Sequence, residues 1–205
     1  QLAFPIELLD PQLLMLLLAK KNQFPRIDIQ WSIQSTNDYC LNQQKNNKPS
    51  SFVCLAEHQE GGRGRRGRSW VSPLGSNLYL SVCSRFKRDY GALEGLSLAV
   101  GLVIADILAN DFGVTNIGLK WPNDIVCNNK KLGGVLIDIQ TSSAGILDVV
   151  VGIGLNICMP ATELVEIDQP YTDIFIETTT RPSRNILAAS IINAVLDLLQ
   201  NFELE

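Results

Sequence analysis

The chain is poor in the residues that build metal centres. It has one histidine, His58, and five cysteines that are widely spaced, with no C-x-x-C pair among them: Cys40, Cys54, Cys83, Cys127 and Cys158. A structural zinc site needs about four such ligands at short, characteristic spacings. The sequence therefore predicts no zinc site. It predicts instead that the cysteines are small packing residues of a protein in a reducing cytoplasm.

Long apolar runs and excess positive charge are also missing. The apolar stretch "LSLAVGLVIA" (96–105) has ten residues, whereas a membrane-spanning helix needs about 20. The run "LLMLLLA" (13–19) lacks the basic start and the cleavage site of a signal peptide. The formal net charge is -4, so a broad nucleic-acid surface is not expected. We predict neither a membrane nor a nucleic-acid partner for this chain.

Apolar patterning in the 205 residues predicts one substantial domain. Asp10 and Pro11 form a helix start at the N-terminal end, followed by an apolar helix. Further helices are expected at 92–112, where Gly113 ends the helix, and at 183–202. Strands are expected at 27–33, 51–57, 77–83, 117–120, 125–127, 132–140 and 146–157, with a polar loop at 42–50 and a turn at Asn128 and Asn129. This pattern predicts an α+β fold with a mixed, largely antiparallel sheet.

Positive charge is concentrated in one segment, "EGGRGRRGRSW" (60–70). Four of the nine arginines lie between Arg63 and Arg68, interleaved with glycines, and Trp70 follows. Glycines let a backbone approach an anion, arginines bind phosphate or carboxylate, and a tryptophan offers a face for a base. The segment lacks the pattern of a Walker A loop and of a Rossmann fingerprint. A solvated basic loop and an arginine–glycine nucleic-acid patch remain as alternatives.

Three other segments combine polar residues with glycines. In "KWPNDIVCNNKKLGGVLID" (120–138), Lys120 and Lys131 flank a predicted hairpin, which could equally be a plain surface hairpin. In "VGIGLNI" (151–157), glycines inside a strand indicate the close approach of a backbone or a ligand, although Asn156 could simply end a core strand. The hydroxyl groups in "QSTND" (34–38) could be no more than helix caps.

Taken together, these segments resemble the biotin protein ligase family. "EHQEGGRGRRGRSW", "STN", "KWPNDI", "KKLGGVLID" and "GIGLNI" occur in the order and at the spacing of that family, over residues 28–203. The resemblance implies the class II aminoacyl-tRNA synthetase-like fold of biotin and lipoate ligases. It also implies a reaction in which biotin and Mg-ATP form biotinyl-5'-AMP, and the biotin then passes to a lysine of a biotin carboxyl carrier domain. Biotin, ATP and Mg²⁺ are the expected ligands.

The resemblance also assigns roles to individual residues. Biotin is expected to contact Ser35, Thr36, Asn37, Gln59, Arg63, Gly64, Arg65 and Lys131. The nucleotide is expected to contact Arg65, Arg66, Trp70, Lys120, Asn123, Asp124 and Asn156, with Mg²⁺ near Asp124. Lys131, Arg63 and Arg65 are the expected catalytic residues, because a carboxylate that attacks a phosphate needs cations between the two anions. We further predict that segment 61–68 closes over the ligands and excludes water.

The resemblance bears on domain organisation as well. Residues 1–26 resemble the linker helix that follows a helix-turn-helix domain in some bacterial members, and 27–205 correspond to the catalytic domain. The small SH3-like domain that ends many members is not found in this sequence. A repressor role would need the DNA-binding domain. A lipoyl-type ligase is the alternative with related chemistry, and a homodimer is left open.

Overall fold

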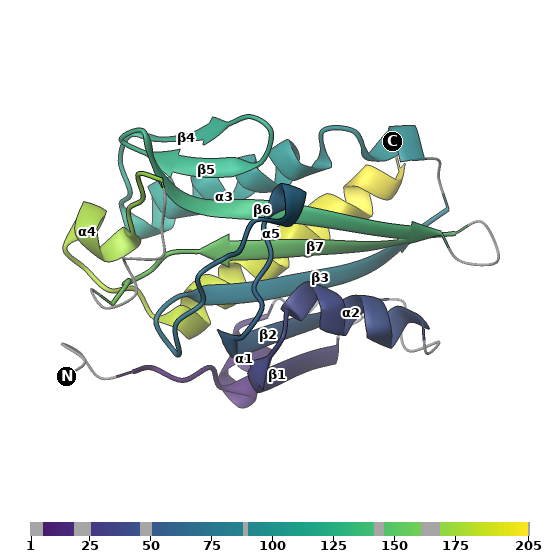
Figure 1. The fold of residues 1–205 in the computed structure, drawn as a ribbon, viewed down its shortest axis with the longest axis horizontal. Coiled ribbons are helices and arrows are strands. Elements are labelled where there is room, and N and C mark those ends of the chain that lie inside the picture. The colour runs from purple at the N-terminus through teal and green to yellow at the C-terminus, as the bar shows by residue number, and fades with distance from the viewer. Residues whose placement is uncertain are drawn as a thin grey trace.

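The computed structural model describes residues 6–18, 26–45, 51–87, 90–141, 146–160 and 169–204. A seven-stranded sheet with the order β1-β2-β3-β7-β6-β5-β4 forms its centre (Figure 1). The strands are β1 (Arg26–Ile33), β2 (Phe52–Gln59), β3 (Leu78–Phe86), β4 (Ile117–Lys120), β5 (Asp124–Cys127), β6 (Lys130–Thr141) and β7 (Leu147–Leu155). β1 and β2 are parallel and all other neighbours are antiparallel. The predicted mixed, largely antiparallel sheet is confirmed.

Helices cover the two faces of the sheet unequally. Helices α3 (Leu96–Phe112) and α5 (Arg184–Leu204) pack behind it, where the main hydrophobic core lies, and α2 (Thr36–Lys45) lies on the front face against β2, β3 and β7 (Figure 1). Because α2 reaches only part of the front face, side chains of β6 and β7 remain open to a ligand. The predicted helix end at Gly113 is confirmed, since this glycine adopts the left-handed conformation with φ 69°.

The short helix α1 (Pro11–Leu17) begins as expected from the sequence. The Asp10 side chain accepts hydrogen bonds from the backbone N–H groups of Gln12 and Leu13, and Pro11 occupies the first helical position. α1 packs against α5, where its Leu14 is buried.

One predicted loop is partly helical. Residues 42–45 of the predicted polar loop 42–50 belong to α2, and 46–50 lie outside the described residues. The prediction failed because α2 is mostly polar and buries mainly polar side chains and Cys40, so apolar periodicity does not reveal it. The helix α4 (Ile174–Thr178) was not predicted either, since it is only one turn and a half long.

The cysteines are packing residues, as predicted. All five are free; Cys40, Cys54, Cys83 and Cys127 are buried, and Cys158 is partly exposed. Burial raises the pKa of the Cys127 thiol to about 11 and raises that of Cys40 further, so these thiols stay protonated. The residues of α5 from Arg184 to Phe202 are long and apolar enough to span a membrane. In this structure, however, they pack against α3 and β3 as a core helix.

Candidate active site

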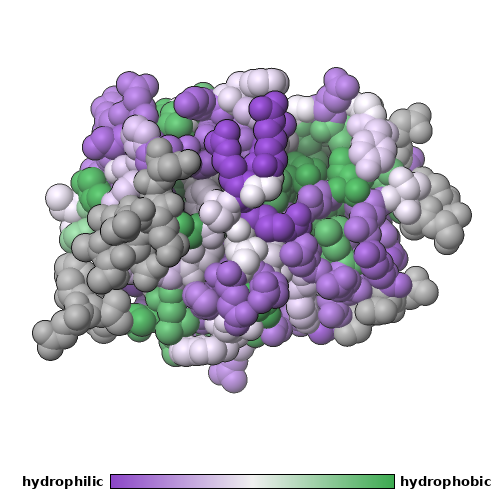
Figure 2. Space-filling view, in the orientation of Figure 1, coloured by the Kyte–Doolittle hydropathy of each residue, from purple (hydrophilic) through white to green (hydrophobic). Residues whose placement is uncertain are grey.

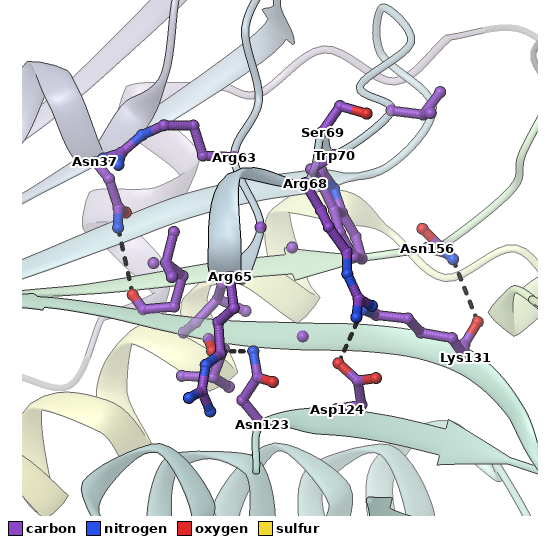
Figure 3. A pocket seen from close by; sticks show the side chains of 18 of the residues that line it. Asn37, Arg63, Arg65, Arg68, Ser69, Trp70, Asn123, Asp124, Lys131 and Asn156 are labelled. Carbon is purple, nitrogen blue, oxygen red and sulfur yellow. Dashed lines mark hydrogen bonds and ion pairs between the residues drawn. The ribbon is translucent and has the colours of Figure 1, made fainter. Parts of the chain in front are cut away.

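One pocket on the front face brings the candidate residues together. Its volume is about 560 Å³. It lies between α2, the segment 60–70 (hereafter the glycine–arginine loop), β6, β7 and the turn between β4 and β5. Figure 3 shows Asn37 towards one end and Lys131 with Asn156 towards the other, with the loop between them. The lining includes Ser35, Thr36, Asn37, Gln59, Arg63, Gly64, Arg65, Arg66, Trp70, Lys120, Asn123, Asp124, Lys131 and Asn156. The structure thus places every candidate residue along a single cavity, while their individual roles remain predictions.

The end of the pocket beside α2 is a closely packed polar cluster. Ser35, Thr36 and Asn37 are each less than 5% exposed. The backbone N–H of Thr36 donates to Gln59 Oε1 at 2.9 Å, and Gln59 Nε2 donates to Ser72 Oγ at 3.0 Å. Polar groups that are already held in place and partly paired can orient a small polar head group with little loss of entropy. This end of the pocket suits a neutral, hydrogen-bonding group.

A glycine in β7 makes room for this cluster. A Cβ atom at Gly152 would overlap the side chain of Asn37, because α2 packs directly on this point of the strand. The sequence indicated that glycines in "VGIGLNI" admit something close to the strand, and at Gly152 this is the Asn37 amide. Ser81 of β3 lies opposite Gly152 in the sheet and donates a hydrogen bond to Asn37 Oδ1 at 2.6 Å.

The glycine–arginine loop crosses the front of the sheet. Figure 2 shows strongly hydrophilic side chains gathered at the centre of this face, where Figure 1 draws the loop in front of β6. The loop closes on itself through an isolated bridge between Arg63 and Ser69. At its tip is the 3-10 turn η1 (Arg65–Gly67), in which Arg66 adopts a left-handed φ of 56°. This conformation is costly for a residue with a side chain. The loop therefore presents its exposed arginines on a strained tip.

The other end of the pocket is built around Trp70. Its indole ring lies against Gly154, where a Cβ atom would be 2.5 Å from Trp70 Cε2, and the indole Nε1 is buried without a hydrogen-bond partner. The Nζ atom of Lys131 lies 5.4 Å from the centre of the ring, within the range of a cation–π contact. A flat aromatic face next to a cation suits a nucleobase with its phosphates nearby.

Asn156 has its amide hydrogens engaged in the ligand-free pocket. Its Nδ2 donates to the backbone carbonyls of Thr172 at 3.0 Å and of Lys131 at 3.5 Å. Asn123 Nδ2 likewise donates to the Val135 carbonyl at 2.8 Å. Asn156 therefore holds the backbone at Lys131, and Asn123 holds β6 at Val135, in addition to lining the pocket. Close by, burial and then the charge of Asp173 raise the pKa of Tyr171, so its phenol stays protonated.

Two of the candidate cations are paired with carboxylates. Lys131 Nζ lies 2.8 Å from Asp124 Oδ1, and Arg63 Nη2 lies 2.7 Å from both Asp38 Oδ1 and Asp138 Oδ2. Within the described part of the chain, Arg65, Arg66, Arg68 and Lys120 form no ion pair. An incoming anion thus meets uncompensated charge first on the loop tip and Lys120.

Sequence reasoning missed several residues of this site. Asp38, Asp138 and Ser81 contact the candidate residues directly, and Tyr171 lines the pocket. For Ser81 there was a signal, namely a single polar residue inside the apolar strand "NLYLSVC". The two aspartates carried none, because ordinary solvated surfaces hold many carboxylates.

Comparison with known families agrees with this geometry. The family model described as "Biotin/lipoate A/B protein ligase family" matches residues 30–156, which include the loop and both ends of the pocket. The chain belongs to the biotin/lipoate A/B protein ligase family. The family resemblance stated from the sequence motifs is thereby confirmed.

Two curated relatives are named as ligases. The chain is 38% identical to "Bifunctional ligase/repressor BirA" of Escherichia coli over 84% of its own length and 53% of the relative's. It is 35% identical to "Biotin--[acetyl-CoA-carboxylase] ligase" of Mycobacterium tuberculosis over 68% and 51% of the two lengths. The chain thus spans about half the length of the curated relatives it matches.

A solved structure of a family member has the same fold. The biotin protein ligase of Leishmania major in complex with biotinyl-5-AMP superposes with a TM-score of 0.66 at 27% identity. The match covers 87% of this chain and 76% of that one. The class II aminoacyl-tRNA synthetase-like fold expected of a ligase-family member is therefore confirmed.

Proposed function

We propose that this chain is the catalytic domain of an ATP-dependent biotin–protein ligase. One observation supports this more than any other: a single pocket joins a neutral hydrogen-bonding end at Thr36 and Gln59 to an aromatic and cationic end at Trp70 and Lys131. The separation suits a substrate with a polar head group at one end and a carboxylate that must meet a nucleotide at the other. The Escherichia coli relative is named a ligase and the Mycobacterium tuberculosis relative a biotin ligase, which agrees with this interpretation.

The first proposed step forms an acyl-adenylate. A carboxylate oxygen of biotin attacks the α-phosphorus of ATP, the bond to the β-phosphate bridging oxygen breaks, and pyrophosphate leaves. Both reactants are anions, so the barrier falls when fixed cations lie where they meet. Lys131 lies between Trp70 and Asp124, and we assign it to this meeting point. Arg65 and Arg66 on the loop tip are assigned to the phosphates.

The second step transfers the acyl group. The neutral amine of a carrier lysine attacks the acyl carbon of the adenylate, AMP departs with the electron pair of the broken bond, and the amine loses a proton. Water would hydrolyse the same mixed anhydride, so the intermediate has to be covered until the lysine arrives. The glycine–arginine loop is the segment assigned to that covering, since it already crosses the pocket.

Magnesium fits this site only as an ion bound together with the nucleotide. Within the described residues, no group of three or more His, Cys, Asp or Glu side chains could hold a metal ion. Asp124 is the nearest candidate ligand, and it is paired with Lys131. Because Mg²⁺ commonly binds through one or two carboxylates and the phosphates of the substrate, the phosphates would supply most of its ligands here.

The carrier domain is the proposed protein partner, and β6 offers it a place to bind. β5 pairs only with Lys130–Gly134 of β6, so within the described residues Val135–Thr141 has β7 on one side and no strand on the other. Figure 2 shows apolar surface at the upper right, over this part of β6 and the neighbouring α3. On that side the Val135 N–H donates to the Asn123 carbonyl, and the carbonyls of Val135 and Ile139 accept hydrogen bonds from Asn123 and Tyr90. An extended partner segment would therefore pair with the backbone around Ile137. A second copy of the chain could use the same edge, which sedimentation would reveal.

The reaction class is tested by ATP–pyrophosphate exchange with biotin and lipoate side by side, followed by mass spectrometry of a carrier domain incubated with biotin and ATP. Exchange driven by biotin and a mass gain of one biotinyl group support the proposal. Exchange driven only by lipoate would refute it in favour of a lipoyl ligase. The repressor role in the name of the Escherichia coli relative is proposed only for a longer chain with a DNA-binding domain, where an operator gel shift tests it.

A further inference from the structure

Asp138 links two parts of the pocket that are far apart in the sequence. Its Oδ2 atom accepts a hydrogen bond from Arg63 Nη2 at 2.7 Å and another from Asn37 Nδ2 at 3.0 Å. Asp138 does not belong to the pocket lining, and its side chain is 25% exposed. It can therefore influence a ligand through its charge and through the residues that it holds, but not by direct contact.

The carboxylate fixes which way the Asn37 amide faces. Besides Asp138 Oδ2, the backbone carbonyl of Leu136 lies 3.3 Å from Asn37 Nδ2. Both partners can only accept hydrogen bonds, so the NH₂ group must lie on their side and Oδ1 on the other. Asn37 is 3% exposed, which removes water as an alternative partner.

This orientation determines the direction of the next hydrogen bond. Asn37 Oδ1 lies 2.6 Å from Ser81 Oγ, and an amide oxygen can only accept. The single hydroxyl hydrogen of Ser81 is therefore directed at Asn37. Thr36 Oγ1 lies 2.7 Å from Ser81 Oγ, and it must be the donor in that pair because Ser81 has no second hydrogen.

Thr36 then has no hydrogen left for a ligand. Gln59 Oε1 lies 3.2 Å from Thr36 Oγ1, but it already accepts a hydrogen bond from the Thr36 backbone N–H at 2.9 Å. What Thr36 Oγ1 offers the pocket is a lone pair, which suits an N–H group of the ligand. The ureido ring of biotin carries such N–H groups, whereas the dithiolane ring of lipoate carries none.

We propose that Asp138 is a positioning residue that acts through Asn37 and Ser81 to make the Thr36 hydroxyl a hydrogen-bond acceptor for a ligand N–H group. The inference rests on the proposed function where it names biotin as that ligand. Asp138→Asn should weaken the relay, because an amide oxygen in the place of Oδ2 is a weaker acceptor than the carboxylate, and an NH₂ group turned towards Asn37 cannot accept at all. A glutamate would maintain it, since it keeps an acceptor-only carboxylate.

The structure supplies a matched control in Asp38. Its Oδ1 lies 2.7 Å from the same Arg63 Nη2 atom, the same distance as Asp138 Oδ2, but among the described residues its carboxylate forms no hydrogen bond with the side-chain amide of Asn37. Asp38→Asn and Asp138→Asn therefore each remove one charge from Arg63. Only Asp138→Asn also disturbs the amide of Asn37.

The test is calorimetric titration of biotin without nucleotide into the wild type, Asp138→Asn, Asp138→Glu and Asp38→Asn, after thermal melts show that each is folded. We expect Asp138→Asn to weaken biotin binding about tenfold, the size of replacing one buried charge-assisted hydrogen bond by a neutral one. Asp38→Asn should change the dissociation constant for biotin by less than about twofold. Asp138→Glu should bind biotin nearly as tightly as the wild type. At saturating biotin, the KM for ATP of Asp138→Asn should stay close to the wild type. Equal losses in the two asparagine variants, or no loss in Asp138→Asn, would overturn the relay.

A second measurement does not depend on the ligand. In the ligand-free protein, the side-chain NH₂ signals of Asn37, assigned by their loss in Asn37→Ala, should exchange slowly with solvent. They should exchange faster in Asp138→Asn but not in Asp38→Asn. If the wild type binds lipoate and not biotin, the proposed function fails, and the Asn37 signals still decide whether the relay exists. Unchanged exchange in Asp138→Asn would refute it.

Discussion

The ammonium group of Lys131 forms an ion pair with Asp124, with 2.8 Å between Nζ and Oδ1. Asp124 begins β5 and Lys131 is the second residue of β6, so the hairpin between these strands brings the two side chains together. Both are largely shielded, with side-chain exposures of 16% for Lys131 and 19% for Asp124. The lysine is thereby held at the pocket before any anion arrives, which reduces the entropy lost on binding.

Lys131→Ala should lower ATP–pyrophosphate exchange by about 100- to 1,000-fold, the loss typical for removing one group that stabilises transition-state charge. Some stability should also be lost, because the largely shielded Asp124 is left without its counter-ion, so exchange is compared at a temperature well below the melting midpoint of each variant. The matched control is Lys130→Ala, which removes the same charge from the neighbouring exposed position of β6. Exchange rates that fall equally in both variants would show that net charge, and not the position of Lys131, is responsible.

Gly154→Ala should raise the KM for ATP about tenfold, in line with the loss of one base–aromatic stack. The added Cβ would lie 2.5 Å from Trp70 Cε2 and must push the indole away from β7. Gly134→Ala is the comparison, because its Cβ would lie at an ordinary 3.7 Å from Trp70 Cζ3. We expect the second substitution to have a much smaller effect in the same exchange assay. A larger rise in the KM for ATP in Gly134→Ala than in Gly154→Ala would mean that Trp70 does not hold the nucleotide.

Glu57→Gln should destabilise the fold by about 3 kcal/mol, because it leaves a buried guanidinium without its counter-ion. Arg184 is fully buried, and its Nη1 lies 2.6 Å from Glu57 Oε2, where the first turn of α5 meets β2. Urea unfolding of both proteins measures the difference. Arg26→Gln breaks the exposed pair with Asp28 instead, and should cost less than about 1 kcal/mol.

Alkaline stability should depend on Tyr39. Burial, and then its hydrogen bond to Asp28, raise the pKa of Tyr39 to about 12 from 10.0. Below pH 10 both the folded and unfolded states keep this proton. Between pH 10 and 12 only the unfolded state releases it, so stability falls as pH rises. Tyr39→Phe should make the free energy of unfolding, measured with urea, fall less steeply between pH 10 and 12. The same pH dependence in both proteins would contradict the assignment.

Amide hydrogen exchange of 61–68 should slow when biotin and ATP are added together. The tip residues Arg65–Gly67 are exposed in the ligand-free structure, and closing over two anions would shield them. The central strand β3 serves as internal reference and should not change. Exchange in the loop that is the same with and without ligands would rule out its role as a cover.

Much of the fold could be predicted from local patterns. The strand 117–120, the helix that ends at Gly113 and the turn at Asn128 and Asn129 were found because apolar period and left-handed turn residues are local signals. The helix α2 was not found, because it rests on the sheet mainly through polar and cysteine side chains. A helix that buries polar side chains has no apolar periodicity, so the sequence pattern does not reveal it.

The amino-acid sequence by itself determined which residues could bind anions and where the chain would need glycine, because charge and backbone freedom are properties of single residues. Only the tertiary structure decided which cations are already neutralised. Arg63 and Asp138 are 75 positions apart, and their contact exists because the loop folds across the sheet onto β6. In the same way, the sequence marks Gly152 as a place of close approach, but the identity of its neighbour, Asn37, follows only from how α2 packs on the sheet.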